Sequence, residues 1–217
     1  MAQNSTGALT RRAALATVMA GAAQAGVPAA RRLAFEAWRG GKRIGRHTLD
    51  FDGDDKNFAV RIEADFAVSL GPITLFRYRM QAVETWRGGR FAELTSRTVT
   101  NGRQEQATAI RGPDGVWVRT AKGARKLPPG VLPLTHWNEA AFAAPLFNPE
   151  TGAAMRETVA RQPGQTLTLP DGRPITATRY ALAGDANIVD WYDAAGVWRA
   201  LSAKAPDGSR IDYRQSA

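Results

Sequence analysis

The chain offers few side chains that could carry out catalysis, and among them are its only two histidines, His47 and His136. His136 stands in the segment Pro133–Gly152, where Trp137 and Glu139 follow it closely. A histidine beside a carboxylate can act as a general base, because the carboxylate orients the imidazole. One hypothesis is therefore acid–base catalysis by His136 oriented by Glu139. The alternative, favoured because no third group completes the arrangement, is that His136 bonds to the loop backbone and packs beside Trp137.

The other residues exclude several kinds of chemistry. His47 lies in the middle of an alternating stretch, where we expect a half-exposed residue of a sheet. The chain has no cysteine, which rules out thiol catalysis, disulfides and cysteine-based metal sites. It also lacks the Gly-x-Ser-x-Gly nucleophile turn and the glycine-rich loops that bind phosphate. We therefore expect no cofactor.

An acidic stretch, Asp50–Asn57, resembles a calcium loop in composition only. Its glycine falls at the fourth position instead of the sixth, and Arg61 occupies the twelfth, where calcium loops need a bidentate Glu. A hairpin turn is the better interpretation, and no metal site is predicted. Nucleic-acid binding is not indicated either, because alternation places Tyr78 on the face opposite Arg77 and Arg79.

The elements that must position these residues are strands. In Phe58–Val68 every even position is apolar and Arg61, Glu63 and Asp65 alternate with them, which is the two-residue period of a half-buried strand. Ile73–Arg87 repeats the pattern, and Asn-Gly, Asp-Gly and Gly-Gly pairs punctuate the chain at hairpin spacing. Further strands are expected at 33–39, 42–51, 90–100, 103–111, 116–120, 156–161, 167–169, 173–183, 187–193, 197–205 and 209–215. The stretch 121–132 reads as a basic loop.

This pattern predicts a mainly all-β fold: a single strongly curved antiparallel sheet, a half-barrel or barrel of about 10–13 strands. The segment Pro133–Gly152, called the insert below, does not alternate and is expected to be irregular or short-helical and to cover an end or face of the sheet. The apolar face it covers is either a filled core or a cavity. If it is a cavity, the expected ligand-binding residues are Phe76, Tyr78, Met80, Trp86, Trp137, Phe142 and Phe147.

The N-terminus has the form of an export signal. Thr10–Leu15 contains a twin arginine, and a short apolar run and small residues follow it, so residues 1–30 are expected to be a twin-arginine signal peptide and residues 31–217 a single β domain. The apolar run is too short to span a bilayer, which needs about 20 residues. We expect a periplasmic protein with no transmembrane segment in the mature chain. Its formal net charge of +9 favours anionic partners such as a membrane surface.

Leu33–Arg214 resembles an uncharacterised exported proteobacterial family, the domain of unknown function DUF6134. The resemblance is carried by Arg43–His47, Gly71–Arg79, His136–Asn138, Asp190–Asp193 and Asp207–Arg214. It implies an exported β protein without an assigned activity, similar in its strand-rich plan to periplasmic lipid carriers.

Three functional hypotheses remain. The first is a non-enzymatic periplasmic protein that binds or transfers a lipid-like hydrophobic ligand in a curved-sheet cavity. The second is an enzyme acting on a lipid or glycan through His136 and Glu139. The third is a structural or accessory envelope protein with a filled core.

Overall fold

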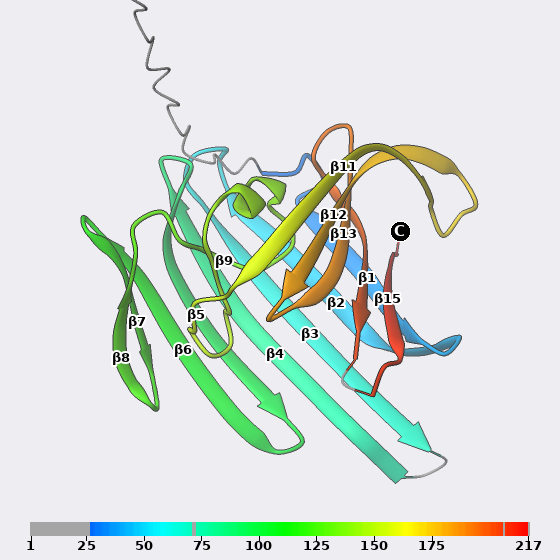
Figure 1. The fold of residues 1–217 in the computed structure, drawn as a ribbon, viewed down its shortest axis with the longest axis horizontal. Coiled ribbons are helices and arrows are strands. Elements are labelled where there is room, and N and C mark those ends of the chain that lie inside the picture. The colour runs from blue at the N-terminus through cyan, green and yellow to red at the C-terminus, as the bar shows by residue number, and fades with distance from the viewer. Residues whose placement is uncertain (1–26, 71–72, 206, 217) are drawn as a thin grey trace, which may run out of the picture.

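The structure, a computed structural model, describes residues 27–70, 73–205 and 207–216. Its main feature is one antiparallel sheet of thirteen strands (Figure 1). The strands of the first half are β1 (Arg32–Arg39), β2 (Lys42–Gly53), β3 (Phe58–Leu70), β4 (Ile73–Arg87), β5 (Arg90–Thr100), β6 (Arg103–Gly112), β7 (Gly115–Thr120) and β8 (Gly123–Leu127). Those of the second half are β11 (Glu157–Thr168), β12 (Pro174–Gly184), β13 (Asn187–Asp193), β14 (Trp198–Lys204) and β15 (Arg210–Gln215).

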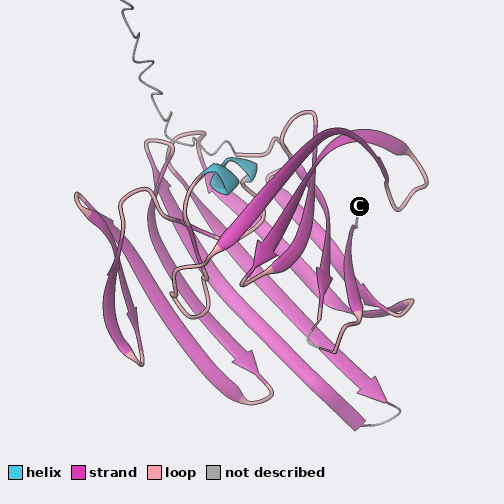
Figure 2. Ribbon diagram, in the orientation of Figure 1, coloured by secondary structure: helices cyan, strands magenta, loops and turns pink. Residues whose placement is uncertain are grey.

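The two halves join at the chain ends, because β15 pairs with β1. The strand order is β11-β12-β13-β14-β15-β1-β2-β3-β4-β5-β6-β7-β8, so β8 and β11 are the two edges and the sheet does not close. It curves strongly, and the β11–β12 hairpin arches over the concave side (Figure 2). The predicted fold class, a single curved antiparallel sheet, is confirmed as an open form.

Two predicted boundaries are wrong. The expected basic loop 121–132 contains strand β8, whose residues are exposed except for Leu127. An edge strand with one buried residue shows no alternation of hydrophobicity, so its sequence reads as a loop. The expected separate strands 156–161 and 167–169 are one strand, β11, with an irregularity between Gln162 and Gln165. Pro163 and Gly164 occupy that irregularity, and they look like a chain break in the sequence.

The insert has the irregular, short-helical character that was predicted. A 3₁₀ helix, η1 (Glu139–Ala143), begins at Asn138, whose side chain accepts a hydrogen bond from the Ala140 N–H. On either side of η1, β9 (Leu132–Pro133) and β10 (Leu146–Phe147) form a short parallel pair. The insert therefore folds back on itself over the concave face.

Three aromatic side chains anchor the insert to distant parts of the sheet. Trp137 meets Phe51, Phe58 and Trp86 edge-on, with ring centroids 5.4–5.7 Å apart. Phe147 packs against Phe91 with ring centroids 6.0 Å apart, and Phe142 packs against Tyr180 with ring centroids 5.0 Å apart. Because these partners lie on β2–β5 and on β12, the insert fills the space between the two halves of the open sheet and links them.

A buried carboxyl group fixes the insert at its centre. Glu84 of β4 is fully buried, and its Oε2 accepts hydrogen bonds from the indole N–H of Trp86 at 2.9 Å and of Trp137 at 3.2 Å. Burial raises the pKa of Glu84, and hydrogen bonds from Thr135 and from the two indoles only partly oppose this effect. Glu84 thus joins the sheet to the insert.

The predicted signal peptide, residues 1–30, lies outside the described residues except for Val27–Ala30, and the sheet begins at Arg32. In the part of the chain that the structure describes, no helix has the length and apolar content needed to cross a bilayer.

Candidate functional site

The insert does not fill the whole concave face, and a cavity of about 320 Å³ lies beside it. Its walls come from β2, β3, β4, β13, β15 and the insert. This volume is at the lower end of the range of about 300–1,000 Å³ found for small-molecule sites. The apolar lining residues are Ile62, Ala64, Phe66, Phe76, Met80, Leu134, Pro149, Met155, Ala186, Ile188 and Ile211. The polar ones are His47, Tyr78, Thr135, His136, Asn148, Glu150, Asp185 and Tyr213.

His136 enters this cavity from the insert in an unusual backbone conformation. Its φ is +68°, in the left-handed region that costs a non-glycine residue about 1–3 kcal/mol. Several contacts hold it there: the ring stacks on Trp198 at a centroid distance of 5.4 Å, and the Tyr192 hydroxyl donates to its carbonyl oxygen. Strain of this kind is kept where the surrounding structure determines a conformation, and it occurs often at functional sites.

The ring of His136 is oriented by Asp190 of β13. Its Nδ1 lies 2.9 Å from Oδ2 of this fully buried residue. The other carboxylate oxygen, Oδ1, accepts a hydrogen bond from the Trp198 indole N–H, also at 2.9 Å. A carboxylate accepts hydrogen bonds, so Nδ1 carries the hydrogen and Nε2 remains as an acceptor when the ring is neutral. This geometry suits hydrogen bonding to a ligand and also acid–base chemistry.

His47 is a second histidine of the cavity wall. His47 is only 6% exposed, and within the described chain neither of its ring nitrogens has a hydrogen-bond partner. Burial lowers the pKa of His47 to about 3, with a smaller contribution from the charge of His136, so the ring is neutral at ordinary pH. The rings of Trp198 and Tyr213 surround it edge-on at 5.6 and 5.5 Å. A buried, unpaired imidazole is costly, and a ligand that both donates and accepts would satisfy it.

The cavity wall also carries a Tyr–Glu pair. The Tyr78 hydroxyl donates to Glu150 Oε1 at 2.7 Å. Burial raises the pKa of both groups; for Tyr78 the negative charge of Glu150 adds to the effect, while for Glu150 the hydrogen bond partly opposes it. Ser96 lies just behind, and its hydroxyl donates to the Pro149 carbonyl, which ties this part of the insert to β5. The polar wall is thus rich in acceptors and rigidly held.

The structure separates the seven residues predicted to line a cavity into two groups. Phe76, Tyr78 and Met80 lie in the cavity wall. The other four belong to the filled core under the insert, with exposed fractions of 2%, 2%, 8% and 0%: Trp86, Trp137, Phe142 and Phe147. Filled core and cavity therefore coexist on the same concave face.

The proposed pairing of His136 with Glu139 requires correction, because the carboxylate bound to the His136 ring is that of Asp190. Glu139 begins η1, and its Oε1 lies at the turn around Gly196, 2.9 Å from where a Cβ would stand on that glycine. At a φ of +68°, His136 has its ring against Asp190 of β13. His47 likewise is buried and not half-exposed, because Trp198 and Tyr213 from the end of the chain cover it.

One signal in the sequence could have found Asp190 and Glu84. Each is an acid flanked at i−2 and i+2 by apolar residues of the inward face: Ile188 and Tyr192 for Asp190, Ala82 and Trp86 for Glu84. A carboxylate on the apolar face of an amphipathic strand is buried when the strand pairs in register. A buried carboxylate needs hydrogen-bond partners.

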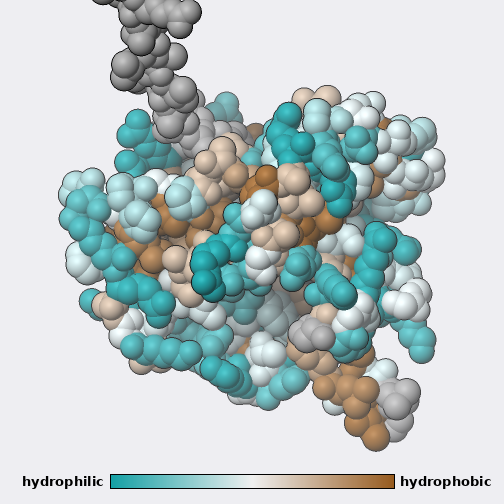
Figure 3. All heavy atoms as spheres, in the orientation of Figure 1, coloured by the Kyte–Doolittle hydropathy of each residue, from teal (hydrophilic) through white to brown (hydrophobic). Residues whose placement is uncertain are grey.

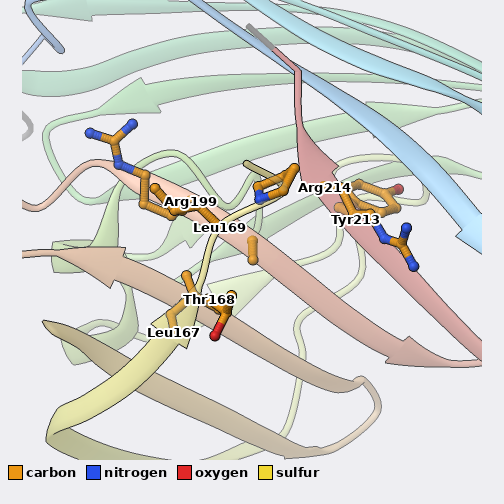
Figure 4. Close-up of a pocket in the computed structure, with 8 residues that line it drawn as sticks. Leu167, Thr168, Leu169, Arg199, Tyr213 and Arg214 are labelled. Carbon is orange, nitrogen blue, oxygen red and sulfur yellow. The ribbon is translucent and has the colours of Figure 1, made fainter. Parts of the chain in front are cut away.

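A second hollow, of about 310 Å³, lies on the surface between the end of β11 and strands β14 and β15 (Figure 4). Leu167, Leu169 and Arg199 are among the residues that line it. The Arg199 guanidinium is already engaged, since Nε donates to Asp193 at 2.8 Å and Nη1 to Gln215 at 2.9 Å. This hollow offers less to a ligand than the cavity.

The acidic turn predicted at Asp50–Asn57 is a hairpin turn. Oδ1 of Asp54 accepts the backbone N–H groups of Lys56 and Asn57, both at 2.8 Å, and these bonds lower the pKa of Asp54. Across residues 27–70, 73–205 and 207–216, no cluster of three or more His, Asp or Glu side chains could hold a metal ion.

Comparisons with known proteins agree with this fold. A family model described as a domain of unknown function (DUF6134) matches residues 35–216. Among solved structures, the chain is similar to the crystal structure of a β-barrel-like protein of the domain of unknown function DUF1849 from Brucella abortus. That match has a TM-score of 0.61 and 11% identity, and it covers 85% of this chain and 94% of the other. At this identity the likeness concerns the fold alone. No curated protein matches the sequence.

Proposed function

The chain belongs to the DUF6134 family of domains of unknown function, and we propose that it binds a lipid-like hydrophobic ligand in the cavity beside the insert. The observation that carries the proposal is the combination of a mostly apolar cavity of about 320 Å³ with a buried His47 in its wall that has no hydrogen-bond partner among the described residues. Apolar walls contribute roughly 0.8 kcal/mol for each methylene group they remove from water. Both ring nitrogens of His47 are shielded from solvent, so the ring would have to turn toward the cavity to bond one polar group of the ligand.

The charges of the wall indicate the class of head group. Among the described residues, no lysine or arginine lines the cavity, whereas Glu150 and Asp185 do. His47 is neutral, and Nδ1 of His136 is occupied by Asp190. A fatty-acid carboxylate would therefore meet acceptors and no free cation. An uncharged head that donates and accepts hydrogen bonds, such as a hydroxyl or an amide, fits the wall better.

The proposal includes the compartment. The twin-arginine segment Thr10–Leu15 supports export, so we place the binding activity in the periplasm, where an apolar molecule needs a protein to cross the aqueous space. Fractionation of the native host, with antibody detection of the chain and a protease-protection control, tests this part separately from binding.

The test of binding is a titration with N-phenyl-1-naphthylamine, whose fluorescence rises in apolar surroundings. Ala186 is a half-buried residue of the cavity wall, and Ala186→Trp should fill the cavity. Ala200 is a half-buried residue of the hollow in Figure 4, so Ala200→Trp is the matched control. We expect saturable binding that A186W weakens at least tenfold and A200W leaves unchanged. A long-chain alcohol should displace the probe better than a fatty acid of the same length. Equal binding by wild type and A186W would refute the proposal.

A second candidate function is acid–base catalysis on a bound ligand, and the His136–Asp190 pair favours it. The pair has the hydrogen bond and the buried carboxylate that orient a general base. His136→Asn removes the imidazole while keeping a residue that tolerates positive φ. If the site is catalytic, H136N converts no ligand but still binds the probe. If the site only binds, wild type returns extracted ligand chemically unchanged.

A further inference from the structure

The β3–β4 hairpin extends beyond the rest of the sheet. Pairing between β2 and β3 ends at Phe66, and pairing between β4 and β5 ends at Tyr78. Beyond these points β3 and β4 pair only with each other, as far as Leu70 opposite Ile73. Four further residues of β3 at about 3.3 Å each make a projection of about 13 Å. We call residues 67–70 and 73–76 the β3–β4 arm; it points away from the sheet in Figure 1.

The arm ends in exposed aliphatic side chains. Ile73 is 62% exposed and Leu75 is 59% exposed, the first and second largest exposures among the exposed large hydrophobic residues of the described chain. Hydrophobic atoms gather at this tip in Figure 3. A two-stranded ribbon with exposed apolar side chains is only marginally stable in water. An apolar environment would bury the exposed side chains of the arm and stabilise it.

The charges behind the tip are positive. Between Asp65 and Glu84 the chain has no acidic residue, whereas Arg77 and Arg79 follow the tip directly. Both arginines are exposed; Arg79 pairs with Asp65 at 3.2 Å, and Arg77 makes no ion pair within the described chain. Arg77 stands two residues, or about 7 Å, behind Leu75. That spacing places its guanidinium at the height of phosphate groups when the tip lies at the boundary of the acyl chains.

We propose that the β3–β4 arm docks this protein on an anionic lipid bilayer, with Ile73 and Leu75 in the interface and Arg77 at the phosphates. A bilayer fits better than a protein partner, because two side chains bury far less than the about 1,000 Å² that a stable protein interface needs. A bilayer also matches the charge of the arginines. The docking does not depend on the proposed function, although Phe76 of the same arm lines the cavity and would bring its wall to the membrane.

The test uses the full chain, which has no native cysteine, so one introduced cysteine gives one labelled site. Ile73→Cys carries an environment-sensitive nitrobenzoxadiazole probe at the tip. Ile110→Cys is the matched control, since Ile110 is 54% exposed on β6, away from the arm. Vesicles contain phosphatidylcholine alone or mixed with phosphatidylglycerol. Residues 1–26 are the same in every variant, so the difference between positions 73 and 110 reports which part of the domain meets the lipid.

We expect a blue shift at position 73, and none at 110, with the anionic vesicles. The shift should need at least tenfold more lipid without phosphatidylglycerol or in 1 M salt, where the Debye length falls to about 3 Å. Arg77→Gln should weaken the shift severalfold, and Arg87→Gln, at the other end of β4, should not. Equal shifts at 73 and 110, or indifference to lipid charge and to R77Q, would overturn the proposal. So would a shift at 73 that grows with protein concentration without vesicles, which would mean that a second copy covers the tip.

Discussion

Replacing Glu84 tests whether a buried carboxyl group holds the insert on the sheet. Glu84→Leu keeps the approximate volume and removes the acceptor of both indole N–H groups, those of Trp86 and Trp137. Glu84→Gln keeps an oxygen in the same place and is the matched control. If the insert depends on these bonds, E84L should destabilise the fold much more than E84Q.

The magnitude follows from the two orphaned donors. Each buried donor without a partner costs about 1–3 kcal/mol, so two cost about 2–6 kcal/mol. Leucine removes the cost of burying a carboxyl group, which reduces the net effect to about 1–4 kcal/mol. In a chain of this size, 3 kcal/mol corresponds to a fall in Tm of about 6–12 °C. For E84Q we expect a change within about 1 kcal/mol.

The pH dependence separates the two forms of the carboxyl group. Because burial raises the pKa of Glu84 in the folded state, the fold favours its protonated form. Its contribution is therefore complete below the unfolded pKa of about 4.3 and is lost as pH rises through the higher folded pKa. Wild type should lose stability relative to E84Q across that window.

The assay is urea unfolding followed by circular dichroism at several pH values for wild type, E84Q and E84L. The reasoning is refuted if E84L is as stable as E84Q at every pH. It is also refuted if wild type loses stability relative to E84Q as pH falls instead of as pH rises. Either result would mean that Glu84 does not hold the insert.

Three further perturbations address the insert and the cavity wall. Gly152→Ala should lower the free energy of unfolding by about 2–4 kcal/mol, because the φ of Gly152 is +64° and an added Cβ would lie 2.2 Å from Val118 Cγ1. The control Gly130→Ala, with φ +81° and no atom within 4 Å of the added Cβ, should cost about 1 kcal/mol. Similar losses in the two variants would contradict the contact with Val118. His136→Ala should be less stable than His136→Asn by about 1 kcal/mol, since Asn adopts positive φ more easily, and equal melting temperatures would argue against strain there. Burial raises the pKa of Glu150, so wild-type stability should fall relative to Glu150→Gln as pH rises above about 4.3, and a pH-independent difference would show that the carboxyl group titrates normally.

The periodic part of the sequence predicted the sheet well. Phe58–Val68 alternates over eleven residues, and the structure buries the inward residues Phe58, Val60 and Ile62 as the alternation indicates. Strand β8 escaped prediction because an exposed edge strand has no apolar face. Local patterning thus identifies strands that bury a face, and it fails where burial is small.

The site was harder to predict, because its contacts join residues far apart in the chain. His136 meets Asp190 across 54 residues, and His47 is covered by Trp198 and Tyr213 from strands β14 and β15. These pairings arise because β15 returns to β1, which no local pattern specifies. The aromatic residues Trp137, Phe142 and Phe147 of the insert were expected to line a cavity, but they lie in the filled core, and nothing in their spacing distinguishes the two positions.

The most direct measurement of the central claim is the mass of what the protein carries. Protein isolated from its native host, as wild type, A186W and A200W, is analysed by native mass spectrometry and by solvent extraction. The account predicts one apolar molecule with an uncharged, hydrogen-bonding head in each copy of wild type and A200W, and its loss from A186W. Wild type without such a molecule, or A186W that retains it, would contradict the account.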